Sequence, residues 1–141
     1  MGITEEGIQG EKRLFAYLKA KNLKFFQADA IGLDNENYSL YEVKHQERYL
    51  PPPFEGHGLP KWQIEARMNF YKKTGIRCKL VIFEKETTNV FEQWLDVLES
   101  KEHFDTQGSK PRRIYPISNF EQWLFNPTKP AGRTGSGDEP L

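Results

Sequence analysis

A predicted β-hairpin over residues 29–44 constrains the fold most, because it brings two carboxylates and a lysine together. Residues 34–37 read Asp-Asn-Glu-Asn, residue types that tolerate turn geometry. A turn centred in the middle of this cluster places Asp29 directly opposite Glu42. Lys44 lies two residues beyond Glu42 and therefore projects from the same face of the sheet.

The opposed acids Asp29 and Glu42 need a neutralising partner. Side chains that face each other across a ladder have β-carbons about 4.5–5.5 Å apart, and like charges at that spacing are destabilising. A divalent cation removes the repulsion, and Lys44 then lies beside it. The hairpin therefore predicts a cation site with an adjacent lysine.

Three features of the sequence resemble the PD-(D/E)XK nuclease superfamily. Asp29 precedes the hairpin turn, and Glu42-Val43-Lys44 follow on the next strand, as in the motif that names the superfamily. The element order is similar too: a helix carrying a glutamate, a hairpin, a helix and a strand. Gln63, at the start of the helix after the lysine strand, also fits. The match is not literal, because Ala28 stands where the motif has proline.

The elements expected from sequence alternate between helix and strand. They are a helix over 4–21 with Glu11 on its apolar stripe, strands over 25–33 and 38–44, a long loop over 45–60, a helix over 61–74, a strand over 78–84, an ambiguous segment over 90–98, a strand over 113–117 and a short helix over 120–125. This order predicts one domain over 1–126, of the α/β or α+β mixed-sheet class with helices on a central sheet. The resemblance implies a restriction-endonuclease-like core. Residues 127–141 have the composition of a flexible tail.

The activity implied by the resemblance is metal-dependent hydrolysis of phosphodiester bonds in DNA, and we expect a structure-selective or weakly sequence-selective endonuclease, because a chain of this length has little surface left for reading bases. Carboxylate oxygens suit Mg²⁺, for which Mn²⁺ is expected to substitute. The implied metal ligands are Asp29, Glu42, the carbonyl of Val43 and, directly or through water, Glu11.

The other implied roles fall on residues around the metal. Lys44 positions or deprotonates the attacking water, and Gln63 orients the water or Lys44. Arg67, His57 and Lys61 are expected to contact the nucleic acid. The aromatic residues Trp62 and Phe70 are expected in the core rather than as platforms for stacking bases.

Two further possibilities are open from sequence. The short core resembles Holliday-junction resolvases, which act as dimers on branched DNA, and also compact phage-borne nucleases, so duplex or branched DNA and a homodimer are expected. The alternative is a non-catalytic nucleic-acid-binding or assembly module that keeps the nuclease fold.

Composition restricts the class of protein. The formal net charge is zero, which argues against a mainly non-specific nucleic-acid binder, although residues 42–85 carry a local excess of basic residues and 86–107 of acidic ones. Cys78 is the single cysteine, which excludes internal disulfides and cysteine-rich zinc clusters. Neither a long apolar run nor a signal-peptide pattern occurs, and a cytoplasmic location is expected.

Overall fold

The fold is that of a computed structural model, which describes residues 12–14, 16–17, 20–21, 29–34 and 36–124. Its elements are β1 (Ala30–Asp34), β2 (Asn37–Gln46), β3 (Gly56–Pro60), α2 (Lys61–Thr74), β4 (Arg77–Glu84), β5 (Asn89–Trp94), α3 (Leu95–Glu99), β6 (Phe104–Asp105), β7 (Arg112–Pro116), a 3₁₀ turn η1 (Ile117–Asn119) and β8 (Glu121–Leu124). Residues 12–14, 16–17 and 20 are helical, within the range predicted for the first helix. Glu11 and the predicted tail lie outside the described residues.

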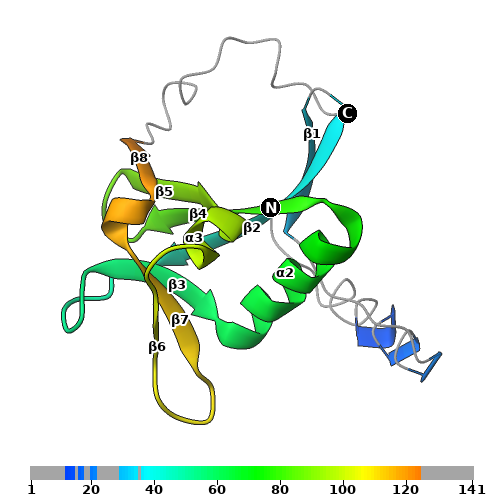
Figure 1. Ribbon diagram of the computed structural model, residues 1–141, viewed down its shortest axis with the longest axis horizontal. Helices are drawn as coiled ribbons and strands as arrows, with labels where there is room; N and C mark the ends of the chain where they lie inside the picture. The colour runs from blue at the N-terminus through cyan, green and yellow to red at the C-terminus, as the bar shows by residue number, and fades with distance from the viewer. Residues whose placement is uncertain (1–11, 15, 18–19, 22–28, 35, 125–141) are drawn as a thin grey trace.

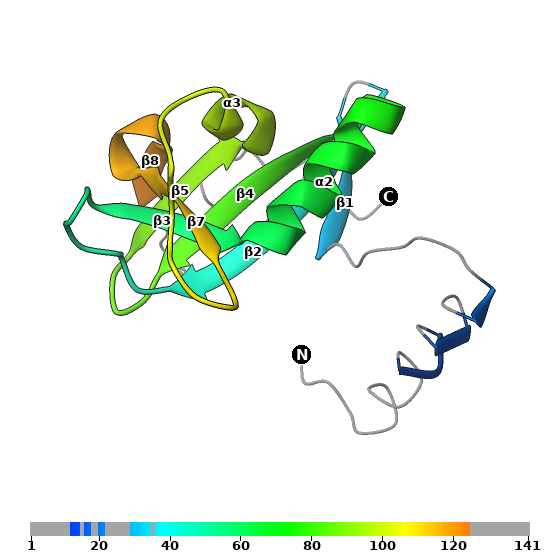
Figure 2. The same cartoon turned by 60° about the horizontal axis from the view of Figure 1, so that its bottom comes forward.

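Two sheets with the helices α2 and α3 make a mixed α/β architecture over residues 29–34 and 36–124, as predicted (Figure 1). The larger sheet has the order β1-β2-β4-β5-β8, and the smaller has the order β3-β7-β6. Strands β2 and β4 are parallel, whereas the other pairs are antiparallel. Parallel neighbours need a crossover connection, and the segment containing β3 and α2 supplies it. Figure 2 shows α2 running beside β4.

The hairpin of β1 and β2 has the predicted register. Ala30 pairs with Tyr41 and Asp34 pairs with Asn37, which centres the turn between residues 35 and 36. Glu36 has a positive φ of 71°, in keeping with its place in a tight turn. Asp34, expected in the turn, is instead the last residue of β1.

One hydrophobic core joins both sheets to the helices. The residues of β2 and β4 alternate between two faces, and the buried members other than Val81 share the face that α2 and α3 cover. Fully buried members of this core come from the larger sheet, the smaller sheet and both helices: Leu80, Ile82 and Phe91; Leu59 and Tyr115; Ile64, Leu95 and Leu98. The same face of β2 carries Glu42 and Lys44, so the packing that builds the core also places the candidate site.

Three predicted elements differ from the structure. The expected loop over 45–60 contains the end of β2 and all of β3, because β3 pairs with β7 from much later in the chain. The ambiguous segment is first the strand β5 and then the helix α3. The helix expected over 120–125 is wrong: β8 forms there, paired with the edge of β5. None of the helices in the described ranges is long and apolar enough to cross a membrane.

Candidate active site

Glu42 is the centre of the candidate site. Its side chain is only 5 % exposed, and buried carboxylates need partners. Oε2 accepts hydrogen bonds from Nε of Arg67 at 3.1 Å and from Nη2 at 2.7 Å. Oε1 lies 3.2 Å from Nζ of Lys44. Two cations therefore compensate one buried carboxylate.

Two local rules bring these groups together. The strand period of two places Glu42 and Lys44 on one face of β2. The helix period places Gln63 and Arg67 on one face of α2. Nη1 of Arg67 also donates to the backbone oxygen of Gln63 at 3.3 Å, within the same turn of the helix.

Asp29 lies immediately before β1 and is exposed. Its Oδ2 accepts a hydrogen bond of 2.9 Å from the backbone N–H of Val43. This bond attaches the carboxylate to β2 one residue after Glu42, consistent with the predicted register. The formal charges of Asp29, Glu42, Lys44 and Arg67 add up to zero.

Gln63 adds an oxygen without a partner. Its Oε1 is buried and accepts no hydrogen bond from the described residues. Buried polar atoms almost always have a partner, so such an atom needs an explanation. A cation or an ordered water would supply one.

The donor set fits a hard divalent cation. Mg²⁺ is commonly held by one or two carboxylates and keeps several waters, and Asp29, Glu42 and the Gln63 amide oxygen are all hard donors. Within the described ranges no group of three or more His, Cys, Asp or Glu side chains could hold a metal ion. Glu11, the third predicted carboxylate, lies outside those ranges.

Cys78 lies on β4 next to Leu40 of β2 and supplies no soft ligand. Burial raises the pKa of its thiol to about 12, and the negative charge of Glu42 contributes further. A neutral buried thiol is a poor metal ligand. The chemistry of the site is therefore that of oxygen donors and fixed cations.

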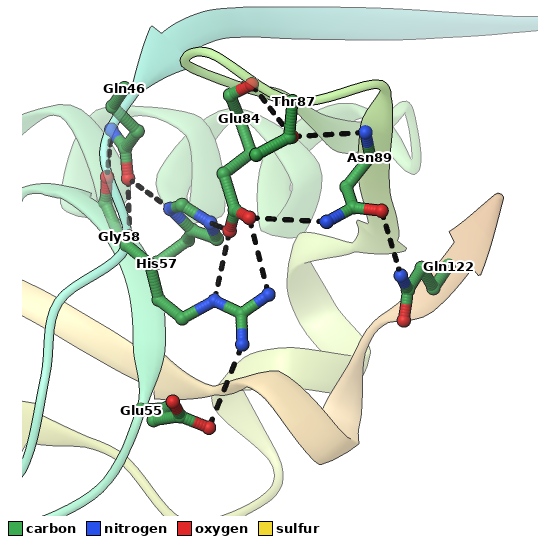
Figure 3. A network of polar contacts seen from close by, with 9 residues as sticks. Gln46, Glu55, His57, Gly58, Glu84, Thr87, Asn89 and Gln122 are labelled. Atoms are coloured by element: carbon green, nitrogen blue, oxygen red, sulfur yellow. Dashed lines mark hydrogen bonds and ion pairs between the residues drawn. The ribbon is translucent and has the colours of Figure 1, made fainter. Parts of the chain in front are cut away.

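A second polar cluster lies at the far end of β2 (Figure 3). Nε2 of His57 lies 2.7 Å from Oε2 of Glu84, and its Nδ1 lies 3.0 Å from Oε1 of Gln46. Arg48 binds both oxygens of Glu84, at 3.0 and 3.2 Å. The His57 ring is fully buried, so it does not contact a phosphate, and its predicted role in nucleic-acid contact is wrong.

The orientation of Gln46 defines how the imidazole is bonded. Gly58 fixes the amide, because its N–H donates to Oε1 and its carbonyl accepts from Nε2 of Gln46. Nδ1 of His57 therefore carries a hydrogen, and Nε2 donates to the Glu84 carboxylate only in the imidazolium form of the ring. Burial lowers the pKa of His57, while the hydrogen bond with Glu84 opposes that lowering. Burial alone would raise the pKa of Glu84, but hydrogen bonds from Arg48 and His57 outweigh it and hold that pKa below its ordinary value.

This cluster connects three strands. Gln46 comes from β2, His57 from β3 and Glu84 from β4, so the cluster fixes β3 against the larger sheet. The sequence analysis did not identify Glu84 or Arg48. Glu84 could have been identified from the sequence, because it is a charged residue at the next inward-facing position of β4 after Leu80 and Ile82.

The remaining predicted contacts lie in α2. Nζ of Lys61 lies 3.3 Å from Oδ2 of Asp105, on the surface. Arg67 is buried on Glu42 and not available to a phosphate in this arrangement. Phe70 packs against the core, as predicted. Trp62, expected in the core, is 65 % exposed, so that prediction is wrong.

Comparisons with known proteins give distant structural likeness and no match in sequence. No protein-family model matches the chain, and no curated protein sequence matches it. A solved structure of Hjc, a Holliday junction resolvase from the archaeal hyperthermophile Archaeoglobus fulgidus, is similar with a TM-score of 0.39 and 14 % identity, over 77 % of this chain and 88 % of that chain. A likeness this distant does not assign the chain to a family.

Proposed function

We propose that the protein is a metal-dependent nuclease that hydrolyses phosphodiester bonds in DNA with little sequence selectivity. The observation that carries the proposal is the contact of Glu42 with Lys44 and Arg67 on a buried face, beside the unpartnered Oε1 of Gln63. The exposed carboxylate of Asp29 accepts a hydrogen bond from the N–H of Val43, the residue between Glu42 and Lys44 on β2. An open carboxylate pair with an adjacent lysine suits hydrolysis at a phosphate.

The proposed roles follow from these positions. Asp29 and Glu42 hold the cation, together with the carbonyl of Val43 and with Glu11 from outside the described residues. Mg²⁺, or Mn²⁺ in its place, supplies Lewis acidity and a bound water of lowered pKa. Lys44 offsets negative charge that grows on the phosphate.

Gln63 and Arg67 support those groups. The Gln63 oxygen accepts a hydrogen bond from the attacking water and orients it. Arg67 holds Glu42 through two hydrogen bonds, so we reassign it from phosphate contact to positioning of the carboxylate. Duplex or branched DNA is the proposed partner, and two copies acting on a branched molecule are the proposed assembly.

A second function has one observation in its favour. Arg67 and Lys44 already neutralise Glu42. A non-catalytic nucleic-acid-binding module that keeps this fold would need only this neutralisation of Glu42.

Cleavage of a panel of DNA substrates separates the two functions. Branched, duplex, single-stranded and flapped DNA are incubated with and without Mg²⁺, and products are followed on denaturing gels. Asp29→Asn and Lys44→Ala are expected to lower the rate at least about 100-fold. Asp29 is exposed, so its substitution leaves the fold intact, whereas Glu42→Gln unpairs buried Arg67 and costs about 3–5 kcal/mol of stability.

Matched controls lie in the turn between β4 and β5. Glu86→Gln makes the same carboxylate-to-amide change and Lys85→Ala the same lysine-to-alanine change at exposed positions, and both variants are expected to cleave as the wild type does. Mg²⁺ is also expected to raise the melting temperature of the wild type, because it binds the folded state. Full activity in Asp29→Asn and Lys44→Ala would falsify the site. Absence of Mg²⁺-dependent cleavage on every substrate would favour the binding module.

A further inference from the structure

A groove of about 680 Å³ lies between the start of α2 and the segment that leads into β7. Pro60 and Pro111 form part of its walls, and Trp62 lines it. The backbone N–H of Lys61 donates to the carbonyl of Pro111 at 2.9 Å, which joins the two walls. The volume is within the range of about 300–1,000 Å³ typical of ligand sites. We call this feature the Trp62 groove.

The exposure of Trp62 follows from helix geometry. Ile64 and Arg67 are the buried residues of α2. Trp62 precedes Ile64 by two residues, about 200° away around the helix, so it projects from the opposite side. The structure leaves 65 % of this large apolar side chain in contact with water. Burying an indole face is favourable, so the groove favours a flat, apolar partner.

The charged residues of the groove indicate which kind of flat, apolar partner it favours. Lys61, Lys110 and Arg112 line it, against the carboxylate of Glu65, and Nζ of Lys61 also lies 3.3 Å from Oδ2 of Asp105. Nη2 of Arg112 donates to the carbonyl of Gly58 at 3.2 Å, whereas its Nε is buried and has no partner among the described residues. An exposed indole flanked by the cations Lys61 and Lys110 matches a nucleobase with its adjoining phosphates.

We propose that the Trp62 groove binds an unpaired nucleobase of a DNA strand, stacked on the indole, with the flanking phosphates on Lys61 and Lys110. A paired base offers only its edge, whereas stacking on an indole needs an open face. Trp62 and the site residues Gln63 and Arg67 all lie on α2, so the groove and the proposed active site share this helix. This inference rests on the proposed function for the identity of the strand and adds a preference for unpaired DNA.

Binding without metal tests the groove separately from catalysis. A fluorescently labelled oligothymidylate and a duplex of equal length are titrated with the full chain in EDTA, and anisotropy is measured. Trp62→Ala is expected to weaken binding of the single strand about tenfold and to leave duplex binding unchanged. Trp62→Phe, which keeps an aromatic face, is expected to retain most of the affinity.

The control variant is Tyr38→Ala, because Tyr38 is an aromatic residue of similar exposure, 55 %, on the hairpin. It is expected to bind both probes as the wild type does, and thermal melts check the folding of every variant. Three results would each overturn the inference. Trp62→Ala could bind the single strand as tightly as the wild type does, or it could lose as much affinity for the duplex as for the single strand. The third result is a wild-type protein that does not bind the single strand. If Asp29→Asn loses cleavage while single-strand binding still depends on Trp62, the active site and the groove are separate sites.

Discussion

Arg67 is a buried residue on which the geometry of the proposed site depends. Sequence reasoning expected it to contact DNA, because a helix face carrying Gln63 and Arg67 beside a predicted cation site suits a phosphate. In the structure the guanidinium is 4 % exposed and binds Glu42. A buried carboxylate attracts the nearest cation, and a phosphate reaches Arg67 only if that pair breaks. Spacing along one helix identified the residue but not its partner.

Trp62 and His57 were misassigned for related reasons. The apolar character of Trp62 predicts burial, but only the position of the sheet decides which side of α2 is covered. His57 lies between glycines and suggested a loop, whereas its partners Gln46 and Glu84 come from other strands. Neither set of neighbours is local in sequence. By contrast, the positions of Asp29, Glu42 and Lys44 follow from strand alternation and from one turn, and both of these are local in sequence.

Asp105 offers a test at the scale of one residue. Nε and Nη2 of Arg113 donate to its two oxygens at 2.7 and 3.0 Å. These hydrogen bonds lower the pKa of Asp105 from 3.8 to about 2. A lowered pKa means that the folded state binds fewer protons than the unfolded state. The stabilisation is therefore present above pH 3.8 and is lost as the pH falls towards 2.

Asp105→Asn is expected to remove this acid-sensitive contribution. The Asp105 side chain is 32 % exposed, and solvent screening reduces the effect at neutral pH to about 1 kcal/mol of unfolding free energy. Urea unfolding at several pH values measures it: the variant loses stability near neutrality and shows a flatter decline in acid. Glu121→Gln, an exposed change on β8, serves as control. An unchanged decline in Asp105→Asn would contradict the assignment.

The elements differ in how far they could be predicted. The register of β1 and β2 follows from a local turn and a period of two, and it was predicted correctly. Residues 120–125 have helical spacing of aromatic and apolar side chains, yet β5 presents an edge that β8 pairs with. Tertiary pairing overrides local preference there. The smaller sheet was missed because its pairing of β3 with β7 spans much of the chain.

The pairing of β3 with β7 gives a test at the scale of elements. A β-carbon built on Gly58 would lie 1.8 Å from the backbone oxygen of Arg113. Backbone cannot rotate aside, so Gly58→Ala must separate the strands and disturb the bonds between Gly58 and Gln46. We expect a loss of about 3 kcal/mol in the free energy of unfolding, measured by urea denaturation.

Gly32→Ala on β1 is the matched control. A β-carbon there would lie 2.7 Å from the ring of Tyr41, and a side chain at the edge of the sheet can move away. We expect a change below about 1 kcal/mol. Equal effects of the two substitutions would show that the approach of β3 to β7 does not limit stability.

At the scale of the whole molecule, ion pairs link the basic segment 42–85 to the acidic segment 86–107. The basic excess in residues 42–85 suggested a surface attractive to polyanions. Arg77 binds Asp96 at 2.9 Å, and Lys79 lies 3.8 Å from Glu92. The fold therefore neutralises part of this excess against the acidic segment that follows. Net charge and its division along the chain were readable from sequence, but these pairings required the sheet order.

We therefore expect the cations of the Trp62 groove to determine how strongly DNA binding depends on salt concentration. Each phosphate neutralised on a single strand contributes about −0.7 to the slope of log K against log salt concentration. Lys61 and Lys110, the proposed phosphate contacts, together predict a slope of about −1.4 for the oligothymidylate. Lys110→Ala is expected to reduce its magnitude by about 0.7, and Lys101→Ala, an exposed change beyond α3, to leave it unchanged. Anisotropy titrations over a range of salt concentrations measure both. A much steeper slope that Lys110→Ala does not alter would place the strand on another surface.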